Sequence, residues 1–174
     1  NLLETLKPSY INSYKKKTIK KYKNFKNFNI IGMGGSILGF EAIYSFLKNK
    51  TNKKFFFINN LGIKNLNQKK IKKKVNLIIS KSGNTLETIT NFNIFVKKND
   101  HNIFITEEKN NYLRKIALNL KADIIEHKNY IGGRYSVLSE VGMLPAELMG
   151  LNANNFKQLN NIIKNKVFIN QLIK

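Results

Sequence analysis

The residue types best suited to chemistry meet in the segment Tyr130–Ser139, where Arg134 directly follows two glycines. Paired glycines let the backbone adopt positive φ and let a ligand approach closely. Arginine carries a planar fork of donors that fits phosphates and other oxyanions, and lysine cannot copy this geometry. Because the chain has only two arginines among its 31 basic residues, this position favours a role that depends on the guanidinium. The alternative is a structural arginine paired with Glu126 or Glu140.

The segment Ser80–Thr85 has the composition of a phosphate-binding turn. Its hydroxyl and amide groups precede a predicted helix, whose N-terminal N–H groups and dipole favour an anion. Lys81 either adds charge there or points to solvent. The alternative is an ordinary helix cap in which Asn84 and Glu87 form a capping box, and both interpretations can hold at once. The predicted phosphate contacts are Ser80, Lys81, Ser82, Gly83, Asn84 and Thr85.

The segment Gly32–Gly39 is a further glycine-rich turn after an apolar run. It does not fit the dinucleotide fingerprint, because position 37 is Ile37 rather than glycine and no acidic residue ends the next predicted strand. It does not fit a Walker motif either, since no Gly-Lys-Ser/Thr follows. Two interpretations stay open. The turn either binds no ligand, or it presents the backbone donors and hydroxyl of Gly34, Gly35 and Ser36 to a small polar ligand.

The histidines and the remaining acidic residues are weaker candidates. His101 lies in a polar loop and is expected to be exposed, and His127 is expected to have a structural or surface role although it lies just before the Arg134 turn. Glu140 and Glu147 are seven residues apart on a predicted helix, so they share a face that we expect to be solvated. No His, Asp or Glu cluster has metal-ligand spacing and the chain has no cysteine, so we predict neither a metal nor a cofactor.

Short apolar runs alternate with helical patterns, and these elements must position the three turns. We expect strands at residues 28–31, 55–58, 75–79, 103–105 and 124–125. We expect helices at residues 2–25 with an interruption at Pro8, from the first turn to about residue 48, and at 66–74, 86–96, 112–120 and 137–149. The alternation predicts an α/β fold, a three-layer αβα sandwich around a doubly wound, five-stranded parallel sheet. All three turns then lie at the carboxyl edge of the strands, where such sheets bind ligands.

Length and composition limit the remaining possibilities. With 174 residues, 42% of them hydrophobic, the chain can form a packed core, which we place at 28–151 between a helical extension at 1–27 and an amphipathic tail at 152–174. The net charge of +21 is almost all lysine, which rises together with Asn and Ile in a biased composition. A nucleic-acid binder would use more arginine, so we expect no nucleic-acid partner. Without a signal peptide or a membrane-spanning apolar run, we expect a soluble cytoplasmic protein.

Three motifs, in this order, resemble the sugar isomerase (SIS) domain of the glucose-6-phosphate isomerase family over roughly residues 28–152. Gly32–Ser36 is similar to the family's Gly-x-Gly-Gly-Ser turn, and Ser80–Thr88 resembles its Ser-Lys-Thr-x-x-Thr-x-Glu-Thr phosphate loop. Tyr130–Ser139, with the helix that follows, resembles its Gly-Gly-Arg-Tyr/Phe-Ser signature. One departure is Ser82–Thr85, which is closer to the general SIS pattern than to the Thr-Phe-Thr-Thr that is usual in the isomerase.

The resemblance implies a flavodoxin-like strand order and the cofactor-free interconversion of glucose 6-phosphate and fructose 6-phosphate in glycolysis and gluconeogenesis. Arg134 would face the reacting carbons and stabilise the enediolate between aldose and ketose, as a fixed cation does for developing negative charge. Gly35 and Ser36 would contact the sugar, with secondary roles for Gly34, Glu87 and Gly133. The residues that would grip the phosphate are Ser80, Lys81, Ser82 and Thr85.

The proton-transferring residues of the family have no counterpart in this chain. In the family a Glu moves the proton, a His helps to open the ring and a Lys assists, all from the second half of a chain more than twice as long, and the partner subunit supplies the His. Proton transfer requires a base within hydrogen-bond reach. The resemblance therefore implies the phosphosugar-binding half of a homodimeric enzyme, with residues 152–174 as the possible start of a second domain. The alternative is a non-catalytic phosphosugar sensor, which needs no arginine over reacting carbons.

Overall fold

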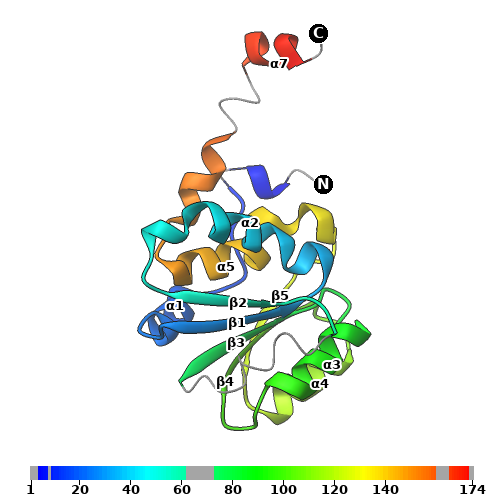
Figure 1. Cartoon of the computed structure of the whole chain (residues 1–174). Coiled ribbons are helices and arrows are strands. Elements are labelled where there is room, and N and C mark those ends of the chain that lie inside the picture. Colours follow the sequence, from blue (N-terminus) through cyan, green and yellow to red (C-terminus); the bar gives the residue numbers. More distant parts are fainter. Residues whose placement is uncertain (1–3, 8, 62–72, 160–164, 173–174) are drawn as a thin grey trace.

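A five-stranded sheet, parallel throughout, forms the centre of the protein in the computed structural model, which describes residues 4–7, 9–61, 73–159 and 165–172. The strand order is β2-β1-β3-β4-β5 (Figure 1). This is the flavodoxin-like order that the resemblance implied, and the predicted fold class is confirmed. The strands are β1 Asn27–Gly32, β2 Lys54–Ile58, β3 Lys74–Ile79, β4 His101–Thr106 and β5 Asp123–Glu126.

Helices cover both faces of the sheet because its strands are apolar on both sides (Figure 1). Phe28 and Ile30 of β1 belong to the core under one helical layer, and Ile31 belongs to the core under the other. The first layer contains α1 Lys16–Tyr22, α2 Leu38–Leu47 and α5 Glu140–Met149, and the second contains α3 Leu86–Phe95 and α4 Tyr112–Asn119. The predicted three-layer sandwich is therefore correct.

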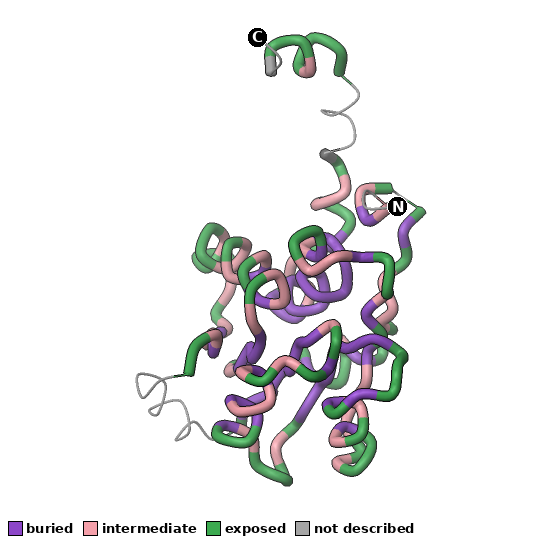
Figure 2. Tube along the Cα trace, turned by 90° about the vertical axis from the view of Figure 1, so that its right-hand side faces the viewer, coloured by how far each residue is buried: buried purple, intermediate pink, exposed green. Residues whose placement is uncertain are grey.

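Burial is concentrated in the sheet and in α5 (Figure 2). Every residue of α5 except Glu147 is buried, because this helix packs against the sheet, α2 and α1, and Tyr10 of the N-terminal segment reaches Glu140. Within the described ranges, no helix has the length and apolar character needed to cross a membrane.

Several predicted helices differ from the observed ones. The N-terminal segment forms only a short 3-10 turn, η1 Glu4–Leu6, and α1. The described residues between them form turns and irregular backbone, and Tyr10 is buried against Glu140. The last core helix begins at Glu140 rather than at residue 137, since Ser139 caps it by accepting a hydrogen bond from the N–H of Val141. A 3-10 helix, η5 Gly133–Leu138, occupies the preceding residues.

The tail and one predicted connection also need correction. The single amphipathic helix expected in residues 152–174 is replaced, within the described residues, by a 3-10 helix, η6 Ala153–Leu159, and a separate helix, α7 Lys166–Leu172. Most of the helix predicted at 66–74 lies outside the described residues, and Lys74 belongs to β3. Two further 3-10 segments are η2 Gly34–Ser36 and η3 Lys48–Lys50.

The register of the sheet brings the ends of the strands together. Gly32 of β1 pairs with Ile79 of β3, Ile79 pairs with Ile105 of β4, and Thr106 pairs with Glu126 of β5. The segments that follow β1, β3 and β5 therefore leave the sheet at one edge. These segments are the three predicted turns, so the fold places all of them at the carboxyl edge.

A polar ladder crosses the amino half of the sheet inside the protein. The amide of Asn29 donates to Asn76 over 2.9 Å, and the amide of Asn76 donates to Asn102 over 2.9 Å and to Asp100 over 3.2 Å. All three asparagines are buried. Their amides mainly bond to one another, which satisfies most of the polar groups that burial would otherwise penalise, although Oδ1 of Asn29 has no hydrogen-bond partner among the described residues.

Candidate functional site

The first and third turns are in direct contact at the carboxyl edge. A Cβ atom added to Gly35 would lie 2.1 Å from the carbonyl oxygen of Gly133, so only glycine fits at position 35. The buried hydroxyl of Ser136 lies 3.0 Å from the Gly35 carbonyl oxygen and 2.7 Å from that of Gly133, and it donates to these two acceptors. The sequence analysis did not single out Ser136, although it is the serine of the Gly-Gly-Arg-Tyr-Ser motif.

Arg134 is exposed beside this contact. Its backbone nitrogen would lie 2.8 Å from a Cβ atom on Gly35, which places it directly next to the first turn. Within the described part of the chain, the guanidinium forms no ion pair or hydrogen bond. The alternative of a structural pair with Glu140 is wrong, because Glu140 is fully buried and bonded to His127 and Tyr10.

The remaining residues of the first turn lie on the outside of this contact. Gly34 has a φ of +51° and is exposed, and a Cβ atom added to it would have no neighbour within 4 Å. Ser36 is half-buried, and its N–H donates to the carbonyl of Met33 inside the turn. The structure therefore places Gly34, Gly35 and Ser36 beside Gly133 and Arg134 at one end of the sheet.

Some polar groups of the second turn form hydrogen bonds within the turn, and others are exposed to solvent. The buried hydroxyl of Ser80 lies 2.9 Å from the hydroxyl of Thr85 and accepts a hydrogen bond from the N–H of Gly83, so Ser80 shapes the turn. Ser82 and Asn84 are exposed. The predicted capping box is wrong. Thr85 is the N-cap residue, and the Asn84 side chain accepts a hydrogen bond from the N–H of Tyr112 in α4 instead.

The side chain of Asn111 packs against Gly83 and supports the second turn, a role that the sequence analysis did not predict. Gly83 has a φ of +67°, and a Cβ atom there would lie 2.0 Å from Oδ1 of Asn111. The same oxygen accepts from the N–H of Arg114, which caps α4, and the Asn111 amide donates to Thr106 over 3.1 Å. An asparagine just before a predicted helix is a helix-cap signal, but nothing in the sequence connects it with Gly83.

Lys81 connects the second turn to the third. Its ammonium donates to the carbonyl oxygen of Asn129 over 2.6 Å and lies 3.5 Å from a carboxylate oxygen of Glu107. Asn129 precedes the Gly132–Gly133 pair, so this side chain reaches across the edge of the sheet rather than pointing freely to solvent. Glu87, which was given a secondary role, is half-buried in the first turn of α3.

A buried charge cluster lies under the Arg134 turn. His127 Nδ1 is 2.7 Å from Glu140 Oε1, and the Tyr10 hydroxyl donates to Glu140 Oε2 over 2.9 Å. The structural role expected for His127 is correct, whereas the solvated face expected for Glu140 and Glu147 is wrong. Burial alone would raise the pKa of Glu140, but hydrogen bonds from His127, from its own backbone N–H and from Tyr10 lower it below its usual value. Burial raises the pKa of Glu147, which is only half exposed.

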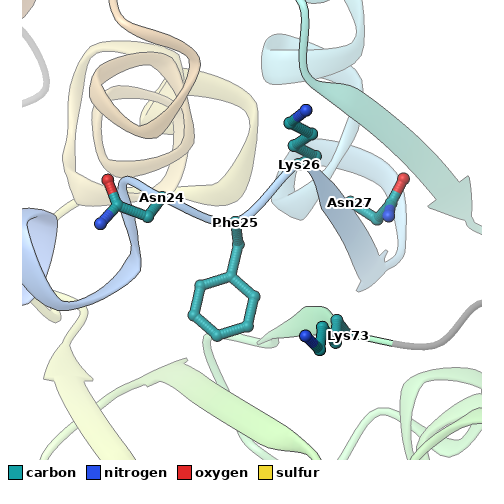
Figure 3. A pocket seen from close by; sticks show the side chains of 5 residues that line it. All are labelled: Asn24, Phe25, Lys26, Asn27 and Lys73. Atoms are coloured by element: carbon teal, nitrogen blue, oxygen red, sulfur yellow. The ribbon is translucent and has the colours of Figure 1, made fainter.

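A hollow of about 490 Å³ lies at the opposite edge of the sheet. Figure 3 shows its lining side chains, Asn24, Phe25, Lys26, Asn27 and Lys73. Asn27 is the first residue of β1 and Lys73 precedes β3, so the hollow is at the amino edge, away from all three turns. This hollow and the predicted site are therefore different places. Across the described ranges, no group of three His, Cys, Asp or Glu residues is arranged to hold a metal ion.

Comparison with known proteins agrees with the three motifs. A sequence model of the family described as phosphoglucose isomerase matches residues 8–167. The chain belongs to the phosphoglucose isomerase family. The glucose-6-phosphate isomerase of Methanocaldococcus jannaschii is 33% identical to it in an alignment that covers 89% of this chain and 44% of the relative. The chain thus spans less than half the length of that family member.

Solved structures share the fold of this family member. The hypothetical protein TT0462 from Thermus thermophilus superposes with a TM-score of 0.72 and 24% identity, covering 81% of this chain and 38% of that one. The tagatose-6-phosphate ketose/aldose isomerase from Escherichia coli superposes with a TM-score of 0.57 and 15% identity, covering 84% and 43%. At these identities the likeness establishes the αβα fold alone.

Proposed function

We propose that this chain is the phosphosugar-binding part of a glucose-6-phosphate isomerase, built on residues 28–151. One observation carries the proposal: an exposed guanidinium, unpaired within the described residues, stands beside the Gly35 turn on the same edge as the exposed Ser82 and Asn84. Membership of the phosphoglucose isomerase family supports the choice of reaction. The fold supports the choice of edge, because parallel sheets bind ligands at their carboxyl ends.

The phosphate would sit at the N-terminus of α3. Backbone N–H groups at a helix start point outward and favour an anion, and the exposed Ser82 and Asn84 stand at this position. Lys81 would supply positive charge from the side. Ser80 would act mainly through the shape of the turn, because its hydroxyl is already bonded to Thr85 and Gly83.

The sugar would extend from this phosphate toward Gly35, Ser36 and Arg134. Isomerisation moves a proton between two adjacent carbons, and negative charge develops on oxygen as the enediolate forms. A fixed guanidinium aimed at that oxygen lowers the barrier because its donors are already oriented. The base would come from polypeptide outside this chain. Glu140 is unsuited to the role because it is buried and bonded to His127 and Tyr10.

Ligand-dependent melting tests the binding step. A ligand that binds only the folded protein raises the melting temperature, so fructose 6-phosphate at millimolar concentration should raise it and unphosphorylated fructose should not. The absence of any shift in a well-folded sample would contradict the proposal.

Arg134→Lys separates the isomerase from the phosphosugar sensor. We expect the variant to bind fructose 6-phosphate within about threefold of the parent, because the phosphate contacts remain. Isomerase activity, measured after mixing with a polypeptide that carries the second half of a family member, should fall about 100-fold, the usual effect of losing one oriented donor. A sensor predicts no activity in either mixture.

We also propose that this edge is covered by another polypeptide, in the simplest case a second copy in a homodimer. Leu38, Leu86 and Tyr112 begin α2, α3 and α4 at the carboxyl edge and are 57%, 71% and 46% exposed. Large apolar side chains gathered at one edge of a domain are typical of interaction surfaces. Sedimentation equilibrium measures the association, and a strictly monomeric chain at micromolar concentration would contradict the homodimer.

A further inference from the structure

Glu107 is a buried carboxylate at the carboxyl edge that the proposed function does not use. It follows β4 directly, and it is only 7% exposed. Its backbone N–H donates to the carbonyl oxygen of Lys81 over 3.1 Å, and its carboxylate lies 3.5 Å from the Lys81 ammonium. Glu107 therefore contacts Lys81 at both ends, at the backbone and at the charged tip.

The held ammonium of Lys81 also reaches the third turn. It donates to the Asn129 carbonyl oxygen over 2.6 Å, in the segment that leads into Gly132–Gly133 and Arg134. A flexible lysine has several rotatable bonds, and fixing it in one arrangement costs side-chain entropy. The carboxylate of Glu107 offsets this cost and selects the arrangement in which Lys81 bridges the second and third turns.

The position of Glu107 is electrostatically unfavourable for simple anion binding. A carboxylate close to a phosphate site repels the phosphate, and its effect is strong where water is excluded. If Glu107 only neutralised Lys81, its removal would strengthen phosphate binding. If it fixes the geometry of Lys81, its removal weakens binding, because ordering the lysine must then be driven by the ligand. The two roles predict opposite signs.

We propose that Glu107 is a positioning residue for sugar-phosphate binding, which holds Lys81 between the phosphate turn and the Arg134 turn. The inference rests on the proposed function. Its ligand class is that of the proposed function, a sugar carrying a terminal phosphate dianion. The neighbouring Glu108 is exposed and provides a matched comparison.

Isothermal titration calorimetry of fructose 6-phosphate into Glu107→Gln and Glu108→Gln tests the proposal. We expect the Kd of Glu107→Gln to rise about tenfold, the size of coupling typical of residues in contact, and that of Glu108→Gln to stay within about twofold. The side chain of Lys109, which also pairs with Glu107, is 74% exposed. Lys109→Met removes this second ion pair and should leave the Kd unchanged. An unchanged or lower Kd for Glu107→Gln would overturn the proposal.

A double-mutant cycle separates positioning from a general effect on stability. In a Lys81→Met background, Glu107→Gln should change the Kd no further, because the side chain that it positions is gone. An equal loss in both backgrounds would show that Glu107 acts by another route. If Glu107→Gln does not fold, Glu107→Asp keeps the charge but withdraws it from Lys81, and its Kd should rise by an intermediate amount. Failure of the unmodified chain to bind fructose 6-phosphate would overturn the proposed function as well, whereas binding that is insensitive to Glu107 would overturn only this inference.

Discussion

The two edges of the sheet differ in whether their polar side chains are already hydrogen-bonded to other protein groups. Toward the amino edge, Asn29, Asn76 and Asn102 are buried and bond mainly to one another, and the hollow is lined by residues at the start of β1 and just before β3. At the carboxyl edge, buried groups such as Ser136 hold a framework on which Arg134 stands exposed. Unpaired donors on a rigid support can bind a ligand, whereas mutually paired amides cannot. The availability of donors is therefore the observation that points to this site.

The largest expected effect comes from the closest contact at the carboxyl edge. Gly35→Ala should lower the free energy of unfolding by more than about 3 kcal/mol, because its Cβ would overlap the Gly133 backbone, which cannot move aside like a side chain. Gly133→Ala is the control. Its Cβ would have only the Gly35 Cα nearby, at 4.0 Å, so it should cost less than about 1 kcal/mol. Urea unfolding measures both, and equal costs would contradict the proposed packing.

The buried cluster under the third turn should make stability depend on acid. Glu140 has a lowered pKa in the folded state, so its contribution is present above its ordinary value of 4.5 and is lost as pH falls through the lower folded value. Glu140→Gln should cost about 3 kcal/mol at neutral pH, as expected for breaking a buried pair, and should flatten the loss of stability below pH 4.5.

The exposed Glu126 supplies the control for that prediction. Glu126→Gln should change stability by less than about 0.5 kcal/mol at neutral pH, as is usual for a surface substitution. Unfolding measured at a series of pH values gives the acid dependence of stability for the parent and for Glu140→Gln. The same acid dependence in both proteins would show that the cluster does not control the acid transition.

The amino edge should affect stability without affecting the ligand. Asn76→Ala leaves the buried amide of Asn29 and the Asn102 oxygen without their partner, so it should cost about 2 kcal/mol. The Kd for fructose 6-phosphate should stay within about twofold of the parent. Asn99→Ala, at an exposed position, should change neither quantity. A large loss of affinity in Asn76→Ala would erase the distinction between the two edges.

A smaller effect is expected where one hydroxyl joins the first and third turns. Ser136→Ala removes a donor to the Gly35 and Gly133 carbonyls and should cost about 1 kcal/mol. Fructose 6-phosphate should also bind more weakly, because both turns contribute to the proposed site. Ser45→Ala on the exposed face of α2 is the comparison and should leave affinity unchanged.

The strands could be predicted from the sequence because each is a short apolar run bounded by polar or glycine residues. The run predicted at 75–79 became Lys74–Ile79, and the run at 28–31 became Asn27–Gly32. Once five such runs alternate with helices, a parallel sheet follows, and so does the placement of the three turns at its carboxyl edge. The roles of the individual site residues remain predictions.

Contacts between distant segments could not be predicted. A seven-residue spacing suggested that Glu140 and Glu147 face solvent, but α5 is covered on nearly all sides and Tyr10, 130 residues away, reaches Glu140. The capping box failed for a similar reason. The spacing of Asn84 and Glu87 predicted a local capping interaction, but the Asn84 side chain instead accepts a hydrogen bond from the N–H of Tyr112 in α4. Local patterns describe a helix end correctly only when no other segment competes for it.

Backbone amide shifts during a fructose 6-phosphate titration, recorded by NMR on the 15N-labelled chain, test the central claim most directly. We expect the largest shifts at residues 34–36, 82–85 and 133–134, all saturating with one Kd, because the proposed ligand contacts all three turns at once. Shifts confined to the amino-edge residues Asn24, Phe25, Lys26, Asn27 and Lys73, or scattered over surface lysines without saturation, would contradict the claim.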